Sequence, residues 1–239
     1  MNNKNLSLKN NLGFKNSKTK QFEKLSKRFD KILPNIISDV QKENKTLNVL
    51  NKNIKLNFEP SELNKFKKYK TIVIIGMGGS ILGAEAIYSF LEIKIKKKIY
   101  FFNDLDENKI LNFKKKENLS RALFIVISKS GNTIETLSNT FALNIIKKNS
   151  KNIIIISERK NNFLSTLSKK LKIFYIEHKN YIGGRYSVLS EVGLIPAHIM
   201  GINIIKLRSE ILYWLKKKNH SFLKDSTVKI ALYIHSKKI

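Results

Sequence analysis

The stretch at residues 71–83, Thr-Ile-Val-Ile-Ile-Gly-Met-Gly-Gly-Ser-Ile-Leu-Gly, is an unbroken apolar run that ends in closely spaced glycines. Short apolar runs bounded by glycine are typical of strands that are buried on both faces of a sheet. Glycines that lead from such a strand into a helix permit a tight turn whose backbone approaches a ligand closely. Residues 71–75 are therefore predicted to be the first strand of a parallel sheet.

Working outward, further apolar runs occur at 99–102, 122–127, 153–156 and 173–176. Helical stretches are predicted between the runs, at 82–93, 107–116, 133–148 and 163–171. This alternation predicts an α/β fold with a doubly wound, mostly parallel five-stranded sheet. Upstream, helical spacing from Phe22 predicts an amphipathic N-terminal helical arm that is interrupted at Pro34 and continues in a second segment to Val40.

The composition excludes several classes of protein. The 239 residues include no cysteine, which rules out disulfides and thiolate metal sites. No apolar run approaches the roughly 18 residues of a membrane span, and the start lacks a secretory signal. We therefore expect a cytoplasmic protein without a membrane partner. The four histidines show no metal-ligand spacing.

The net charge of +28 would by itself suggest a nucleic-acid partner. Only five of the 46 basic residues are arginine, however, and the lysines are spread over the whole length. A nucleic-acid interface would concentrate arginine and exposed aromatics on one face. We interpret the charge as a solvated lysine coat that attracts phosphorylated metabolites, and we expect no nucleic-acid partner.

The glycine loop after the first strand offers backbone N–H groups at Gly78, Gly79 and Ser80 to an anion, beside a helix N-terminus. A dinucleotide fingerprint fails because Ile81 stands where its third glycine is required, and no Gly-Lys-Ser/Thr follows for a Walker loop. The alternative is a plain tight turn.

A second loop, Ser128-Lys129-Ser130-Gly131-Asn132-Thr133, follows the third strand and is dense in hydroxyls. Ser128, Ser130 and Thr133 offer O–H donors, and Lys129 offers a cation. Asn132 and Glu135 approximate a capping box, which predicts a helix start at Thr133. The loop could therefore hold a phosphate or simply cap the helix.

A third segment, Gly183-Gly184-Arg185-Tyr186-Ser187, places paired glycines before an arginine. In a chain that otherwise uses lysine, an arginine suggests that its forked geometry or its permanent charge is required. A surface salt bridge is the alternative.

Together, the segments 76–83, 128–136 and 183–193 resemble the glucose-6-phosphate isomerase family, over roughly residues 71–201. The resemblance implies a sugar-isomerase (SIS) type of fold, similar to flavodoxin, divided into a helical arm (1–65), a sugar-phosphate-binding domain (66–203) and a helical linker with the start of a second domain (204–239). Ser130 replaces a threonine that the family has.

The resemblance also implies the roles of particular residues. Gly78, Gly79, Ser80, Ser128, Lys129, Ser130 and Thr133 would bind the phosphate, and Gly184 and Arg185 would face the sugar. Arg185 would be catalytic, stabilising charge on a cis-enediol as glucose 6-phosphate and fructose 6-phosphate interconvert. No cofactor is implied, and the partners are a sugar phosphate and a second copy in a homodimer.

The family also uses a glutamate base, a ring-opening histidine and a late lysine, all in its second half. We therefore expect the base beyond residue 239 and interpret Glu135 and Glu191 as structural. A stand-alone module that binds or senses phosphosugars without catalysis is the alternative function.

Overall fold

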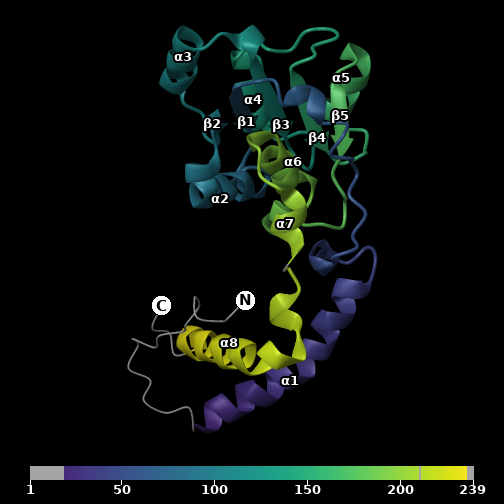
Figure 1. The fold of residues 1–239 in the computed structure, drawn as a ribbon, viewed down its shortest axis with the longest axis vertical. Coiled ribbons are helices and arrows are strands. Elements are labelled where there is room, and N and C mark those ends of the chain that lie inside the picture. The colour runs from purple at the N-terminus through teal and green to yellow at the C-terminus, as the bar shows by residue number, and fades with distance from the viewer. Residues whose placement is uncertain (1–18, 210, 236–239) are drawn as a thin grey trace.

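The structure, a computed structural model, describes residues 19–209 and 211–235. At its centre is one sheet made of β1 (Thr71–Ile75), β2 (Lys98–Phe102), β3 (Ala122–Ile127), β4 (Ile153–Ser157) and β5 (Phe174–Glu177). The strand order is β2-β1-β3-β4-β5, and all four pairings are parallel (Figure 1). The predicted five-stranded parallel sheet is confirmed, and each strand lies within one residue of its predicted bounds.

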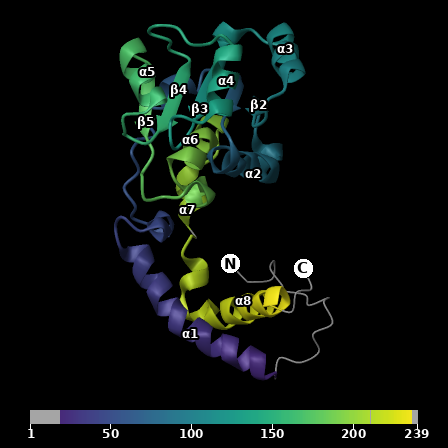
Figure 2. The same cartoon turned by 180° about the vertical axis from the view of Figure 1, so that it is seen from behind.

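Helices cover both faces of this sheet (Figure 2). On one face lie α2 (Leu82–Leu91) and α6 (Glu191–Met200), and on the other lie α3 (Glu107–Lys116), α4 (Ile134–Ala142) and α5 (Phe163–Leu171). The predicted doubly wound arrangement is confirmed.

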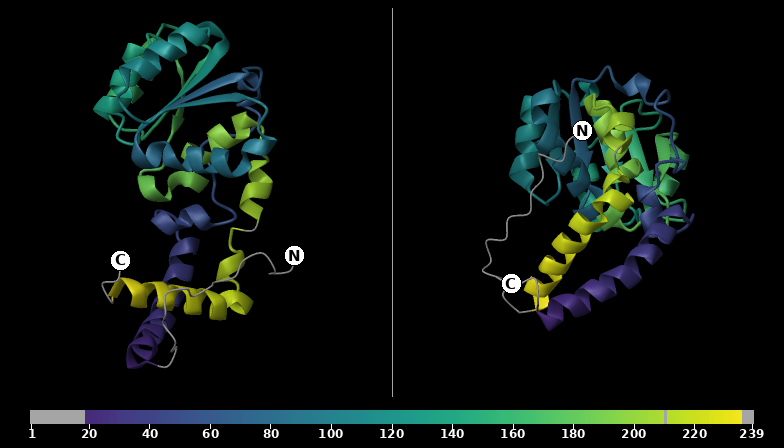
Figure 3. Two further views of the ribbon diagram at one scale, coloured as in Figure 1. Left: turned by 90° about the vertical axis from the view of Figure 1, so that its left-hand side faces the viewer. Right: turned by 60° about the horizontal axis from the view of Figure 1, so that its bottom comes forward.

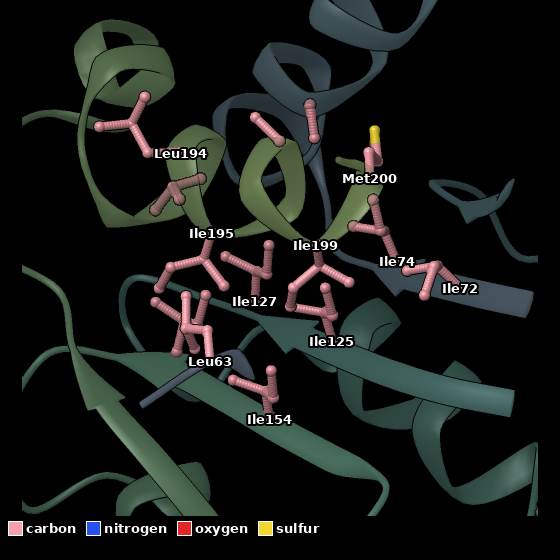
Figure 4. Packing of buried hydrophobic residues seen from close by; sticks show 14 of the residues in the cluster. Leu63, Ile72, Ile74, Ile125, Ile127, Ile154, Leu194, Ile195, Ile199 and Met200 are labelled. Carbon is pink, nitrogen blue, oxygen red and sulfur yellow. The ribbon is translucent and has the colours of Figure 1, made fainter. Parts of the chain in front are cut away.

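The strand β3 shows why its apolar run is continuous. Its six residues are all buried, and their side chains alternate between the two faces. Ile125 and Ile127 point to the α6 side, where they meet Ile195 and Ile199 (Figure 4). Because both faces are covered, no polar position is tolerated, and each buried isoleucine contributes roughly 1.5–3 kcal/mol to stability.

The strand order places the topological switch point between β1 and β3, because the chain leaves β1 towards β2 and then returns past β1 to β3. Ile75 is in register with Val126, so the loops that follow the two strands begin side by side. Ligands in open parallel sheets bind at this kind of crevice. The two loops singled out in the sequence therefore share one edge of the sheet.

The N-terminal arm is one helix, α1 (Lys20–Gln41), and the predicted interruption at Pro34 is wrong. A proline inside a helix removes a hydrogen bond and costs about 3 kcal/mol in isolation. Leu33 and Val40, on either side of Pro34, are buried, and α1 packs against α8 (His220–His235), which crosses it (Figure 3). Tertiary packing therefore outweighs the proline. Residues 1–18 of the predicted arm lie outside the described residues.

The helix predicted over 133–148 ends early, at Ala142. Asn144 adopts a left-handed conformation, with φ 55°, which asparagine tolerates better than most residues. Leu143 and Ile145, on either side, are buried in the core beside β3. The chain leaves the helix so that both can be buried. Among the described residues, no helix is long and apolar enough to cross a membrane.

Candidate functional site

Three hydroxyl groups meet in the loop that joins β3 to α4. Ser128 Oγ lies 2.8 Å from Thr133 Oγ1, and Ser130 Oγ lies 3.4 Å from each of them. The backbone N–H of Gly131 donates to Ser128 Oγ at 3.1 Å, so the loop folds around that buried oxygen. Gly131 has φ 70°, a conformation that glycine adopts at little cost. The loop therefore brings three hydroxyl groups together.

The N-terminus of α4 adds to this site. Thr133 is the N-cap, but its side chain makes no capping bond and its oxygen is bonded to Ser128 instead. The first-turn N–H groups of α4 are thus left without a capping side chain, and such groups attract an anion. The predicted capping box is wrong, because Asn132 Oδ1 accepts from the N–H of Phe163 on α5.

The glycine loop after β1 forms a short 3₁₀ turn, η4 (Gly78–Ser80). A Cβ on Gly76 would lie 2.9 Å from the carbonyl oxygen of Ile127, the last residue of β3, and 3.3 Å from the Cβ of Ser80. Ser80 is therefore placed beside the end of β3, where the loop of residues 128–133, called here the hydroxyl loop, begins. Gly78 has φ 51°, with open space around it.

The Gly-Gly-Arg segment lies directly on the glycine loop. A Cβ on Gly79 would come within 2.3 Å of the carbonyl carbon of Gly184 and 2.9 Å of the backbone nitrogen of Arg185. Ser187 Oγ donates to the carbonyl oxygens of Gly79, at 3.0 Å, and of Gly184, at 2.7 Å. Only glycine at position 79 allows this backbone-to-backbone contact, so it fixes where Arg185 stands.

The side chain of Arg185 is exposed in the 3₁₀ helix η7 (Gly184–Leu189). Within the described part of the chain, its guanidinium makes no hydrogen bond or ion pair. The surface salt bridge that we held as the alternative is therefore absent among these residues. Arg185 stands next to the glycine loop as a cation whose donors have no partner among residues 19–209 and 211–235.

Lys129 is placed differently from the other predicted phosphate ligands. Its ammonium group donates to the carbonyl oxygen of Asn180 at 2.8 Å and pairs with Glu158 Oε1 at 3.3 Å. Burial alone would raise the pKa of Glu158, but hydrogen bonds and charge from Lys160 and Lys129 lower it below its ordinary value. The carboxylate is thus held ionised, and the Lys129 charge is compensated within the protein.

The two acidic residues that we interpreted as structural differ in exposure. Glu191 is fully buried and accepts from the N–H of Asn57 at 2.9 Å, which fits a structural role. Its second carboxylate oxygen lies 3.9 Å from Nδ1 of the buried His178. Glu135 is exposed in the first turn of α4. No group of three or more metal-ligating side chains occurs among the described residues.

Sequence reasoning missed Glu158, Asn162 and Arg208. The first two follow β4 and reach the hydroxyl loop only in the folded chain. Arg208 is nearly buried and donates to the carbonyl oxygens of Val49, Asn51 and Leu189, joining the arm to the end of η7. A signal for Arg208 was present in the sequence. Arginine is rare in this lysine-rich chain, so Arg208 stood out in the same way as Arg185.

Comparisons with known sequences point to one family. The family model described as phosphoglucose isomerase matches residues 32–214. A probable glucose-6-phosphate isomerase of Methanococcus maripaludis is 35% identical over 207 residues, which cover 82% of this chain and 46% of the relative. A glucose-6-phosphate isomerase of Borreliella afzelii is 37% identical over 140 residues, which cover 54% of this chain and 26% of the relative. The chain spans less than half the length of these relatives.

Solved structures share the fold. The crystal structure of a glucose-6-phosphate isomerase from Chlamydia trachomatis matches with a TM-score of 0.60 at 19% identity, covering 81% of this chain and 44% of that one. A hypothetical protein from Thermus thermophilus matches with a TM-score of 0.66, also at 19% identity, covering 90% of this chain and 55% of that one.

Proposed function

This chain belongs to the phosphoglucose isomerase family, and on that premise we propose that it binds the sugar phosphate in a glucose-6-phosphate isomerase. The reaction would interconvert glucose 6-phosphate and fructose 6-phosphate. Because the chain spans less than half of its matched relatives, turnover is proposed for the whole enzyme and substrate binding for this chain.

The observation that carries this proposal is the hydroxyl trio at the start of α4. Oxygens of Ser128, Ser130 and Thr133 lie within 3.4 Å of one another, next to a helix N-terminus without a capping side chain. A phosphoryl group offers acceptor oxygens to O–H and N–H donors and carries the negative charge that a helix N-terminus favours. Together with the neighbouring Ser80, these donors suit a phosphate monoester.

The placement of Arg185 supports the sugar end of the proposal. Its backbone is held against Gly79 and its guanidinium lacks a partner among the described residues, so its donors are available to substrate oxygens. A fixed cation in this position would stabilise negative charge that develops on an enediol. We assign no general base within this chain, because Glu191 is buried and committed to Asn57. The base would come from the part of the enzyme that this chain does not match.

Titration calorimetry on this chain tests the binding proposal. Glucose 6-phosphate and fructose 6-phosphate should bind, inorganic phosphate should bind more weakly, and unphosphorylated glucose should not bind measurably. Lack of heat with both sugar phosphates, from protein shown to be folded by circular dichroism, would refute the proposal.

A coupled isomerase assay separates the enzyme from a phosphosugar-sensing module. We expect binding without turnover for this chain alone and turnover for the intact gene product. Binding without turnover in the intact product would favour the sensor. The homodimer and the division at residues 65 and 203 are further parts of this proposal that rest on the family resemblance. The cytoplasmic location is another part, and it rests on the composition of the sequence.

A further inference from the structure

The hydroxyl loop is tied on its far side to the segment that follows β4. The N–H of Glu158 donates to the carbonyl oxygen of Lys129 at 3.0 Å, while the ammonium group of Lys129 returns to the Glu158 carboxylate at 3.3 Å. The two residues therefore hold each other through both backbone and side chain. The Glu158 side chain is only 7% exposed and the Lys129 side chain is 29% exposed, so solvent screens this pair less than it screens an ion pair between two exposed side chains.

The start of α5 makes three more contacts with the same loop. The N–H of Leu164 donates to the carbonyl oxygen of Gly131 at 3.1 Å, and the N–H of Phe163 donates to Asn132 Oδ1 at 2.8 Å. A Cβ on Gly131 would lie 1.9 Å from Oδ1 of Asn162. The Asn162 amide in turn donates to the carbonyl oxygen of Glu158 at 2.8 Å.

These contacts divide the loop into two sides. Lys129, Gly131 and Asn132 contact the segment 158–164, whereas the hydroxyls of Ser128, Ser130 and Thr133 bond to one another. Two N–H groups at the start of α5 donate hydrogen bonds to the loop, so α5 acts as a brace that holds the loop in place. The N-terminus of α4, which has no capping side chain, is the helix end that faces the ligand.

We infer that Glu158 and Asn162 are positioning residues that hold the hydroxyl loop in its phosphate-binding shape, and that Lys129 acts through Glu158 rather than by a direct contact with phosphate. The second half of this inference rests on the proposed function; the brace itself does not. It revises the role that the family resemblance implied for Lys129.

The charges around Glu158 argue against a Lys129 that swings to the ligand. Besides Lys129, this carboxylate pairs only with Lys160 among the described residues, and the Lys160 side chain is 66% exposed. Moving Lys129 would also break its bond to Asn180. A buried carboxylate that loses a partner is costly, so the pair is expected to survive ligand binding.

Glu158→Gln, Lys129→Met and the double variant test the inference with two readouts. The first is hydrogen exchange of the amides of residues 158 and 164, which donate to the hydroxyl loop, measured without ligand. The second is the dissociation constant for glucose 6-phosphate. Glu177→Gln is the matched control, because Glu177 is the last residue of β5 and its carboxylate pairs with Arg159 at 3.8 Å, not with Lys129 or the hydroxyl loop.

If Glu158 acts as a brace, both single variants should exchange these amides at least about 10-fold faster. Both should also weaken glucose 6-phosphate binding by similar factors. The dissociation constant of the double variant should be no higher than that of the single variant that binds more weakly. Lys129→Arg should restore slow exchange, and Glu177→Gln should change neither readout. Unchanged exchange in both single variants would overturn the brace, whether or not the protein binds sugar phosphates.

Weaker binding in Lys129→Met with unchanged or tighter binding in Glu158→Gln would show direct contact between Lys129 and phosphate, and would overturn the inference. If Glu158→Gln does not fold, the exchange rates in Lys129→Met and Lys129→Arg decide whether the brace exists. A wild-type chain that binds no sugar phosphate would refute the proposed function, while the exchange data would still decide the brace.

Discussion

Ser128 and Thr133 place their hydroxyl oxygens 2.8 Å apart, one at the end of β3 and the other at the N-cap of α4. An N-cap threonine ordinarily accepts from its own helix. Here Thr133 bonds back to Ser128, and the helix N–H groups stay open to a ligand. The strand end and the helix start thus form one binding surface.

Ser128→Ala should weaken glucose 6-phosphate binding by roughly 10- to 100-fold, because a hydrogen bond to a charged group contributes about 1.5–3 kcal/mol. Calorimetry measures the loss. The exposed Ser138 on α4 provides the control, since Ser138→Ala removes a hydroxyl from the same helix and should leave affinity unchanged. Equal affinity in Ser128→Ala and the wild type would argue against a phosphate at this loop.

Gly79→Ala should separate the glycine loop from the Gly-Gly-Arg segment. The new Cβ would meet the backbone of Gly184 at 2.3 Å, and two backbones cannot yield as a flexible side chain can. Overpacking of this kind costs roughly 1–3 kcal/mol, and displacement of Arg185 should also lower substrate affinity. Urea unfolding and calorimetry measure the two effects.

Gly201→Ala is the matched control. Gly201, the C-cap of α6, has a positive φ but nothing within 4 Å, so alanine there costs only backbone strain, about 1–2 kcal/mol. Similar losses of sugar-phosphate affinity in both variants would mean that the contact between Gly79 and Gly184 does not position Arg185.

Arg208→Lys should destabilise the protein by roughly 3 kcal/mol. Two separate guanidinium nitrogens reach the carbonyl oxygens of Leu189 and of Val49 and Asn51, and the single nitrogen of lysine cannot occupy both positions. Each buried acceptor left unpaired costs about 1–3 kcal/mol. Urea unfolding checks this. Arg121→Lys, at an exposed position, should be neutral within about 0.5 kcal/mol. A neutral Arg208→Lys would show that the guanidinium fork is not required.

The features that could be predicted from the sequence are those that local pattern decides. The run 122–127 had to be a doubly buried strand because no polar residue interrupts it, and the order of strands and helices then brought the loops at Gly76 and Ser128 to one edge. The convergence of the three hydroxyls followed from their spacing within a six-residue loop.

The remaining features depend on residues that are distant in sequence. Asn132 looked like a helix cap, but its oxygen serves Phe163, 31 residues later. Lys129 remains a predicted phosphate ligand, but its ion pair with Glu158 could not be predicted, because no local pattern links the two residues. Pro34 was predicted to break the helix, but α1 continues through it because α1 packs against α8. At Asn132 and Pro34 a tertiary contact outweighed a correct local tendency.

A last prediction concerns pH and His198, which lines a cavity of about 290 Å³ with Lys67 and Pro60, residues that precede β1. Burial, followed by the charge of Lys67, lowers the pKa of His198 below its ordinary value of 6.5, although a hydrogen bond with Pro60 opposes the shift. The unfolded chain then binds the proton more readily than the folded chain, so stability is present above pH 6.5 and lost as the pH falls below it.

His198→Gln, which stays neutral, should reduce the drop in urea midpoint between pH 7.5 and pH 5.5. His235→Gln, at an exposed position on α8, should reproduce the wild-type drop, and an equal drop in all three proteins would show that His198 carries none of it.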